Sequence, residues 1–170
     1  MVILKSRDEI AVMREAGRVV ALTLEAVKAA VRPGVSLREL DAIGEETIRG
    51  HGATPSFLGY RPHFAPTPFR GTLCLSPNDV IVHGIPDATR LREGDLLSID
   101  CGAIVEGYHG DAAMTVPVGQ IDAAAERLLA VTRFALETGI RQARAGNRLS
   151  DISHAVGKVA HEAGYGIVPD

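Results

Sequence analysis

The sequence predicts an α+β fold in which an antiparallel sheet is covered by helices. Three observations lead to this fold class. Four stretches with helical periodicity frame one strand-rich block, the first two helices begin with capping signals, and the block contains a hairpin pattern. With 170 residues, the chain has the size of one ordinary domain and can bury a substantial core.

The first helix pair is expected at about 7–32 and 36–50. Each helix begins with a capping box, in which Ser6 or Ser36 is followed three residues later by a glutamate. Apolar residues then recur close to the 3.6-residue period of a helix. Pro33 and the glycine after it end the first helix.

The strand-rich block follows a proline-rich segment. Residues 53–71 contain four prolines and are expected to form a loop. Strands are predicted near 72–76 and 80–83, and a hairpin at 96–118 that turns at about 105–107.

The second helix pair, expected at about 122–144 and 149–163, repeats the first at a shift of 112 residues. The coinciding positions are Leu24/Leu136, Glu25/Glu137, Arg32/Arg144, Gly34/Gly146, Leu37/Leu149, Leu40/Ile152 and Gly52/Gly164. The first pair leads into a sheet unit, and the second leads only to Asp170. On this basis we expect slightly more than half of a pseudo-symmetric protein, in one incomplete domain spanning 1–170.

Two aspartates eleven residues apart, Asp100 and Asp111, lie on the two arms of the predicted hairpin. A turn of two or four residues places them nearly opposite each other on one face, and an odd turn needs a bulge to do so. Carboxylates that close repel, so one keeps its proton or a cation lies between them. A divalent metal pair is the usual cation for oxygen ligands, and two exposed aspartates on a solvated hairpin are the alternative.

Composition narrows the function classes. A net charge of −3 gives no reason to expect nucleic acid or an anionic membrane as a partner. Apolar runs are too short to span a membrane, and the first nine residues lack a signal-peptide core. Cys74 and Cys101 do not form a CxxC pair, which fits free thiols in a cytoplasmic protein.

Three segments resemble the N-terminal part of the type I methionine aminopeptidases, which have the pita-bread fold. Residues 7–17 are RDEIAVMREAG, residues 78–86 are NDVIVHGIP, and residues 98–111 are SIDCGAIVEGYHGD. The resemblance extends from residue 7 to the last residue. It implies a cytoplasmic, monomeric metallopeptidase that hydrolyses the N-terminal methionine from polypeptides.

The same resemblance implies roles for five residues. Asp100 and Asp111 match the family's aspartate ligands of two divalent metal ions, which are cobalt, manganese, iron or zinc. His83 matches a histidine that assists the substrate and stabilises the tetrahedral species. Tyr60 and Cys74 match residues of the methionine pocket.

The sequence departs from the family's pattern in two places. The 61–73 segment between Tyr60 and Cys74 is longer than usual, which could reshape the pocket rim. The family's remaining ligands, one histidine and two glutamates, follow the position of Asp170, and none is present here.

Two aspartates offer at most four oxygens, so we expect at most one weakly bound ion and an inactive fragment with a tendency to self-associate. Two alternatives stay open. The chain is a non-catalytic binding module of the same fold, or one part of a split or oligomeric enzyme.

The other candidate side chains are expected to be structural. We expect His109 to point away from the Asp111 face, and Cys101 to lie in the core because it follows Asp100 directly. His63 lies in the long loop and could line the pocket. The remaining histidines are expected to be solvated at helix ends or on polar helix faces: His51, His154 and His161.

Overall fold

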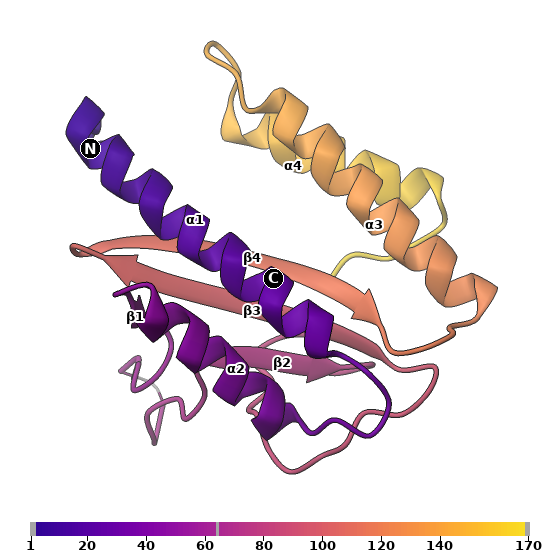
Figure 1. Cartoon of the computed structure of the whole chain (residues 1–170). Helices are drawn as coiled ribbons and strands as arrows, with labels where there is room; N and C mark the ends of the chain where they lie inside the picture. The colour runs from indigo at the N-terminus through magenta and orange to yellow at the C-terminus, as the bar shows by residue number, and fades with distance from the viewer. Residues whose placement is uncertain (1–2, 64, 169–170) are drawn as a thin grey trace. The chain divides into compact units, whose positions relative to one another are not determined.

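The computed structural model describes residues 3–63 and 65–168 (Figure 1). Its elements, in chain order, are α1 (Arg7–Ala30), α2 (Leu37–Gly50), β1 (Thr54–Pro55), β2 (Leu73–Pro77), β3 (Leu96–Val105), β4 (Tyr108–Pro117), α3 (Ala123–Gln142) and α4 (Leu149–Glu162). They form two compact units, which divide between Ile121 and Asp122. The α+β class predicted from the sequence is confirmed.

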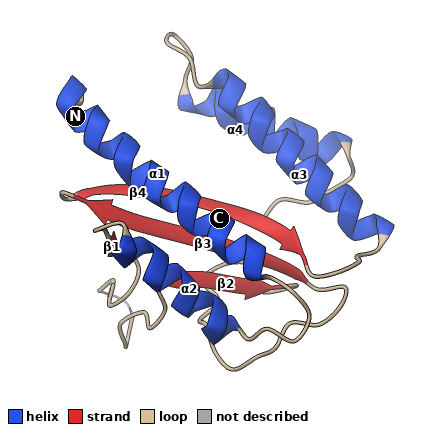
Figure 2. Cartoon of the chain, viewed as in Figure 1, coloured by secondary structure: helices blue, strands red, loops and turns tan. Residues whose placement is uncertain are grey.

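Strand β3 is the centre of the sheet in the first unit (Figure 2). It pairs antiparallel with β4 along one edge, and with β2 and the two-residue β1 along the other. Successive residues of β3 therefore alternate between the two faces of the sheet. The residues of one face are fully buried: Leu97, Ile99, Cys101 and Ala103.

Helices α1 and α2 cover that buried face. Both capping boxes are formed, since the Ser6 and Ser36 hydroxyls accept from backbone N–H groups and the glutamates three residues on accept in return. Val19, Leu24 and Leu40 are among the helix residues that join the strand side chains in one apolar core. Helix α1 ends at Ala30, slightly before the expected boundary, because the residue preceding Pro33 is disfavoured in helical geometry.

Two details of the strand block differ from the predictions. Residues 54–55, inside the expected loop, pair with β3. Residues 80–83 do not form a strand, although their apolar run predicts one. The Val80 N–H bonds to the Pro77 carbonyl in a turn, and Ile81 is 67% exposed. The backbone turns at Val80 directly after β2, so the segment starts as a turn instead of an extended strand.

Helices α3 and α4 form the second unit. The Asp122 side chain caps α3 by accepting from the Ala125 N–H at 2.7 Å. Gly139 faces the Val156 side chain, so α4 packs closely at this point. Leu24 and Leu37 of the first pair are 5% and 3% exposed, while their repeat counterparts, Leu136 and Leu149, are 57% and 80% exposed. The two copies thus share a pattern but differ in burial.

None of the helices in the described part of the chain combines the length and the apolar character needed to cross a membrane.

Candidate functional site

Asp100 and Asp111 lie on the sheet face opposite the two helices of the first unit. The hairpin turns through Glu106 and Gly107 alone, both with positive φ (47° and 83°), as in a type I′ turn. This two-residue turn pairs Asp111 with Gly102, so the two aspartates share one face, as predicted. They are diagonal neighbours rather than opposite each other, because the register partner of Asp100 is Ala113.

The two carboxyl groups influence each other. Partial burial raises the pKa of Asp100 first, and the neighbouring Asp111 carboxylate raises it further. The charge of His83 acts in the opposite direction. Asp100 is partly buried, and Asp111 is exposed. The pair therefore favours holding a proton or receiving a cation.

Cys74 is the register partner of Asp100 on β2, so its side chain lies beside that carboxylate. It is 4% exposed, and burial with the charges of Asp100 and Asp111 raises the pKa of its thiol to about 12. The thiol is neutral and forms an apolar wall beside the two carboxyl groups. Cys101 is fully buried in the core, on the face that the helices cover, as predicted.

His83 follows β2 in the segment that returns along this strand. Its backbone has a positive φ of 59°. The next residue is held against β2, since the Gly84 N–H donates to Ser76 Oγ at 3.0 Å and the Leu75 N–H donates to the Gly84 carbonyl at 2.9 Å. A side chain at Gly84 would collide with the Leu75 carbonyl, so only glycine permits this approach. These contacts position His83 where its charge acts on Asp100.

Tyr60 lies in the long loop between β1 and β2. Two backbone hydrogen bonds close the loop, from the Gly59 N–H to the Phe69 carbonyl and from the Phe69 N–H back to the Tyr60 carbonyl, each at 2.9 Å. The Tyr60 residue is 63% exposed. The predicted pocket roles of Tyr60 and His63 stay predictions.

The prediction for His109 was wrong. It lies two positions before Asp111 along β4, so both side chains lie on the same face, and its Nδ1 is 3.0 Å from Ser56 Oγ. Ser56 and Phe57 also lie against Gly102, where a Cβ would come within 2.8 and 2.9 Å of their side chains. The even spacing between positions 109 and 111 was the signal that could have revealed this neighbourhood.

The side chains on this face of the sheet provide part of the ligand set that a divalent ion needs. Two carboxylates are the oxygen ligands that hard divalent cations prefer. Within the described ranges, no group of three or more His, Cys, Asp or Glu side chains is arranged to hold a metal ion. Asp100 and Asp111 therefore fit as two members of a ligand set.

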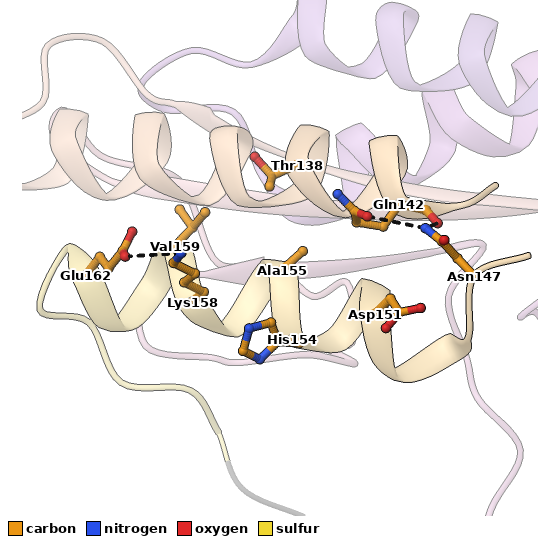
Figure 3. A pocket seen from close by; sticks show the side chains of 9 residues that line it. All are labelled: Thr138, Gln142, Asn147, Asp151, His154, Ala155, Lys158, Val159 and Glu162. Atoms are coloured by element: carbon orange, nitrogen blue, oxygen red, sulfur yellow. Dashed lines mark hydrogen bonds and ion pairs between the residues drawn. The ribbon is translucent and has the colours of Figure 1, made fainter.

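A concavity lies between α3 and α4, with a volume of about 610 Å³ (Figure 3). Its polar groups are largely engaged with one another. Lys158 Nζ is 3.8 Å from Glu162 Oε1, and Asn147 Nδ2 donates to the Gln142 carbonyl at 2.9 Å. The lining residues are Thr138, Gln142, Asn147, Asp151, His154, Ala155, Lys158, Val159 and Glu162.

Comparison with known proteins gives one consistent result. The family model described as "Metallopeptidase family M24" matches residues 11–170. Methionine aminopeptidase 1 of Bacillus subtilis (strain 168) is 46% identical over 168 residues, covering 99% of this chain and 65% of the relative. Methionine aminopeptidase 1 of Mycobacterium tuberculosis (strain CDC 1551 / Oshkosh) is 48% identical over 165 residues, covering 95% of this chain and 60% of the relative.

A solved structure agrees with these sequence matches. The crystal structure of methionine aminopeptidase from Rickettsia prowazekii superposes with a TM-score of 0.94 at 32% identity, over 100% of this chain and 66% of that one. The chain thus spans somewhat less than two thirds of the length of these relatives.

Proposed function

Because the chain belongs to metallopeptidase family M24 and has its pita-bread fold, we propose that it serves the metal-dependent removal of N-terminal methionine from polypeptides. The observation that carries the proposal is the pair Asp100 and Asp111 on one sheet face, with the charge of His83 acting on Asp100. The identity of 46% to a methionine aminopeptidase over nearly the whole chain supports it.

In this proposal Asp100 and Asp111 are ligands of divalent ions, with two ions in the complete site. Cobalt, manganese, iron and zinc are the candidate metals. Bound ions supply a Lewis acid and an activated water for peptide hydrolysis. The two carboxylates hold them with oxygen atoms whose mutual repulsion a cation relieves.

His83 and Cys74 act on the substrate. His83 is exposed beside Asp100, so its imidazole donates a hydrogen bond to the oxygen that becomes negative in the tetrahedral species. Cys74 offers a neutral, poorly hydrated surface next to Asp100, which suits a methionine side chain. Tyr60 completes the pocket from the long loop.

A chimera tests the proposal. Residues 1–170 replace the matching part of Bacillus subtilis methionine aminopeptidase 1, and release of methionine from Met-Gly peptides is measured with Mn²⁺ or Co²⁺. We expect activity that disappears in Asp111→Ala and falls by about 10²–10³-fold in His83→Ala, the loss typical of one oxyanion donor. A folded, metal-loaded chimera without activity would contradict the proposal and favour a binding module.

We also propose that the protein works in the cytoplasm. Its two cysteines are buried free thiols on adjacent strands, and they point to opposite faces of the sheet. They cannot form a disulfide with each other, and free thiols suit a reducing compartment. Cell fractionation with an antibody to the chain would check this, and recovery with a secreted or membrane fraction would contradict it.

A further inference from the structure

The backbone of helix α1 packs directly against the backbone of strand β4 at Gly110, the residue before Asp111. Gly110 faces the helix, and a Cβ at this position would lie 2.6 Å from the Ala16 carbonyl carbon and 2.7 Å from both the Ala16 oxygen and the Gly17 nitrogen. These are backbone atoms of a helix, so no rotamer change can make room. We call this approach of α1 to β4 the Gly110 contact.

The Gly110 contact and the Asp111 side chain lie on opposite faces of the same strand. Adjacent residues alternate across a sheet, so α1 supports β4 from behind at the place where Asp111 leaves the front. Helix and strand are also joined nearer the hairpin turn, where the Tyr108 hydroxyl donates to Glu9 Oε1 at 2.5 Å. Figure 1 shows α1 running along this part of the sheet.

Strand β4 has one strand neighbour in the described part of the chain. It pairs with β3 along one edge, and no described strand pairs with its other edge. A change in its distance from α1 is therefore opposed mainly by the β3 ladder. Asp100 sits on β3 itself, so any displacement of β4 changes the separation of the two carboxylates.

From this arrangement we propose that Gly110 is a positioning residue, which sets the placement of Asp111 relative to Asp100 by letting α1 rest on the β4 backbone. The proposal rests on the proposed function, in which these two carboxylates bind a divalent ion.

The size of the effect follows from the contact distance. A methyl group at position 110 needs roughly 0.8 Å more space, because its nearest atom lies at 2.6 Å and ordinary contact begins at 3.4 Å. Metal–oxygen distances in proteins tolerate about 0.2 Å. Changes to groups that orient a ligand typically weaken metal binding by about 10–100-fold.

The test measures Mn²⁺ binding to the 170-residue chain by calorimetry, with circular dichroism as a check on folding. Gly110→Ala is expected to weaken Mn²⁺ binding by about 10–100-fold while the chain stays folded. Gly17→Ala is the matched control, since its Cβ meets nothing within 4 Å, and its affinity is expected to equal that of the parent. A folded Gly110→Ala chain with parental affinity would overturn the proposal.

Mn²⁺ binding to the parent chain distinguishes a failure of this proposal from a failure of the proposed function. If it binds no Mn²⁺, or if Asp111→Asn leaves its binding unchanged, the proposed metal site is wrong. If the parent binds and Asp111→Asn does not, the site stands and Gly110→Ala decides the positioning role.

A measurement on the parent chain covers the case in which Gly110→Ala does not fold. Mn²⁺ is expected to slow amide hydrogen exchange at residues 15–18 of α1 more than at residues 41–44 of α2, because only the former support β4. Equal protection of the two helices, or none at α1, would overturn the proposal.

Discussion

Asp100 carries a carboxylate whose charged form is disfavoured in the folded chain. Partial burial and the neighbouring Asp111 both raise its pKa, while the charge of His83 and a backbone hydrogen bond from Cys101 oppose them. Without a cation, therefore, the two aspartates destabilise the fold. A substitution that removes one charge and keeps the shape should relieve this repulsion.

Asp100→Asn and Asp111→Asn are both expected to raise Tm by about 0.4–4 °C at pH 7 in EDTA. Like charges on neighbouring strands cost roughly 0.2–1 kcal/mol, and 1 kcal/mol shifts Tm by about 2–4 °C in a domain of this size. Thermal melting followed by circular dichroism measures the change. Asp79→Asn, at an exposed position after β2, serves as the control. If both site variants melt at or below the parent temperature, the carboxylates do not repel across a shared site.

The raised pKa of Asp100 also predicts how stability changes with pH. The folded chain holds this proton to a higher pH than the unfolded chain, whose Asp pKa is near 3.8. The resulting stabilisation is present in full below that value and is lost as pH rises through the folded pKa. In EDTA, Tm of the parent should therefore fall relative to Asp100→Asn as pH rises from 4 to 7. Parallel curves for the two proteins would contradict this.

At the level of single residues, the sequence spacing predicted which side chains lie on each face of β3 and β4. It did not predict which loop residues contact these strands. The parity of positions 100, 101 and 111 correctly placed two aspartates on one face and a core cysteine on the other. The contacts of Ser56 and Phe57 with Gly102 come from a segment about 45 residues away. No periodicity in the sequence encodes such a long-range contact.

Elements were predictable wherever local signals agreed. Capping boxes and turn glycines located α1 and α2 to within about two residues, the usual uncertainty of helix ends. The prediction for residues 80–83 was wrong because their β-branched residues favour a strand, while the Val80 N–H bonds to the Pro77 carbonyl and turns the backbone there. The predicted roles of the 61–73 loop had no comparable local basis, because a loop's path depends on what it packs against.

Two glycines in the second helix pair offer a matched test of packing between elements. Gly139→Ala is expected to destabilise the chain by about 1–3 kcal/mol, because its Cβ would lie 2.7 Å from Val156 Cγ2. Gly157→Ala meets nothing within 4 Å and should stabilise α4 by roughly 0.5–1 kcal/mol. Urea unfolding of both variants measures the difference. A Gly139→Ala chain as stable as Gly157→Ala would show that α3 and α4 do not pack closely there.

At the scale of the whole molecule, the number of available ligands limits the chemistry. Asp100 and Asp111 supply at most four oxygens, and a divalent ion of this type takes about six ligands. The described residues contain no further cluster of ligand side chains. The structure contains two helix pairs, and the repeat predicted between them gave the first indication that this sheet unit has no counterpart among the described residues.

The 170-residue chain is therefore expected to bind a single Mn²⁺, weakly, and to release no detectable methionine from Met-Gly peptides. Calorimetry measures the stoichiometry, and a methionine-release assay with Mn²⁺ or Co²⁺ measures turnover. Two tight sites, or turnover that vanishes in Asp111→Ala, would show that the ligand set is completed in a way that these residues do not reveal.

The exposed apolar side chains of α3 predict association between copies of the chain. Leu136 and Ile140 are 57% and 62% exposed, and burying each is worth roughly 1.5–3 kcal/mol. The double variant Leu136→Lys/Ile140→Lys should weaken association at least about tenfold in sedimentation equilibrium. Glu137→Lys, on the same helix, controls for added positive charge. Equal association of both variants would place the contact elsewhere.

The two-residue turn at Glu106 and Gly107 restricts how this hairpin can vary during evolution. Adding or deleting a single residue there would exchange inside for outside along all of β4, turning Asp111 toward the helices and Gly110 toward the opposite face of the sheet. Insertions of two residues preserve the side-chain pattern and merely lengthen the tip. Length variation in homologous hairpins should therefore occur in even steps, or in odd steps accompanied by a bulge that restores the alternation. The same arithmetic makes the tip a suitable place to graft a short peptide, provided that the graft has an even number of residues.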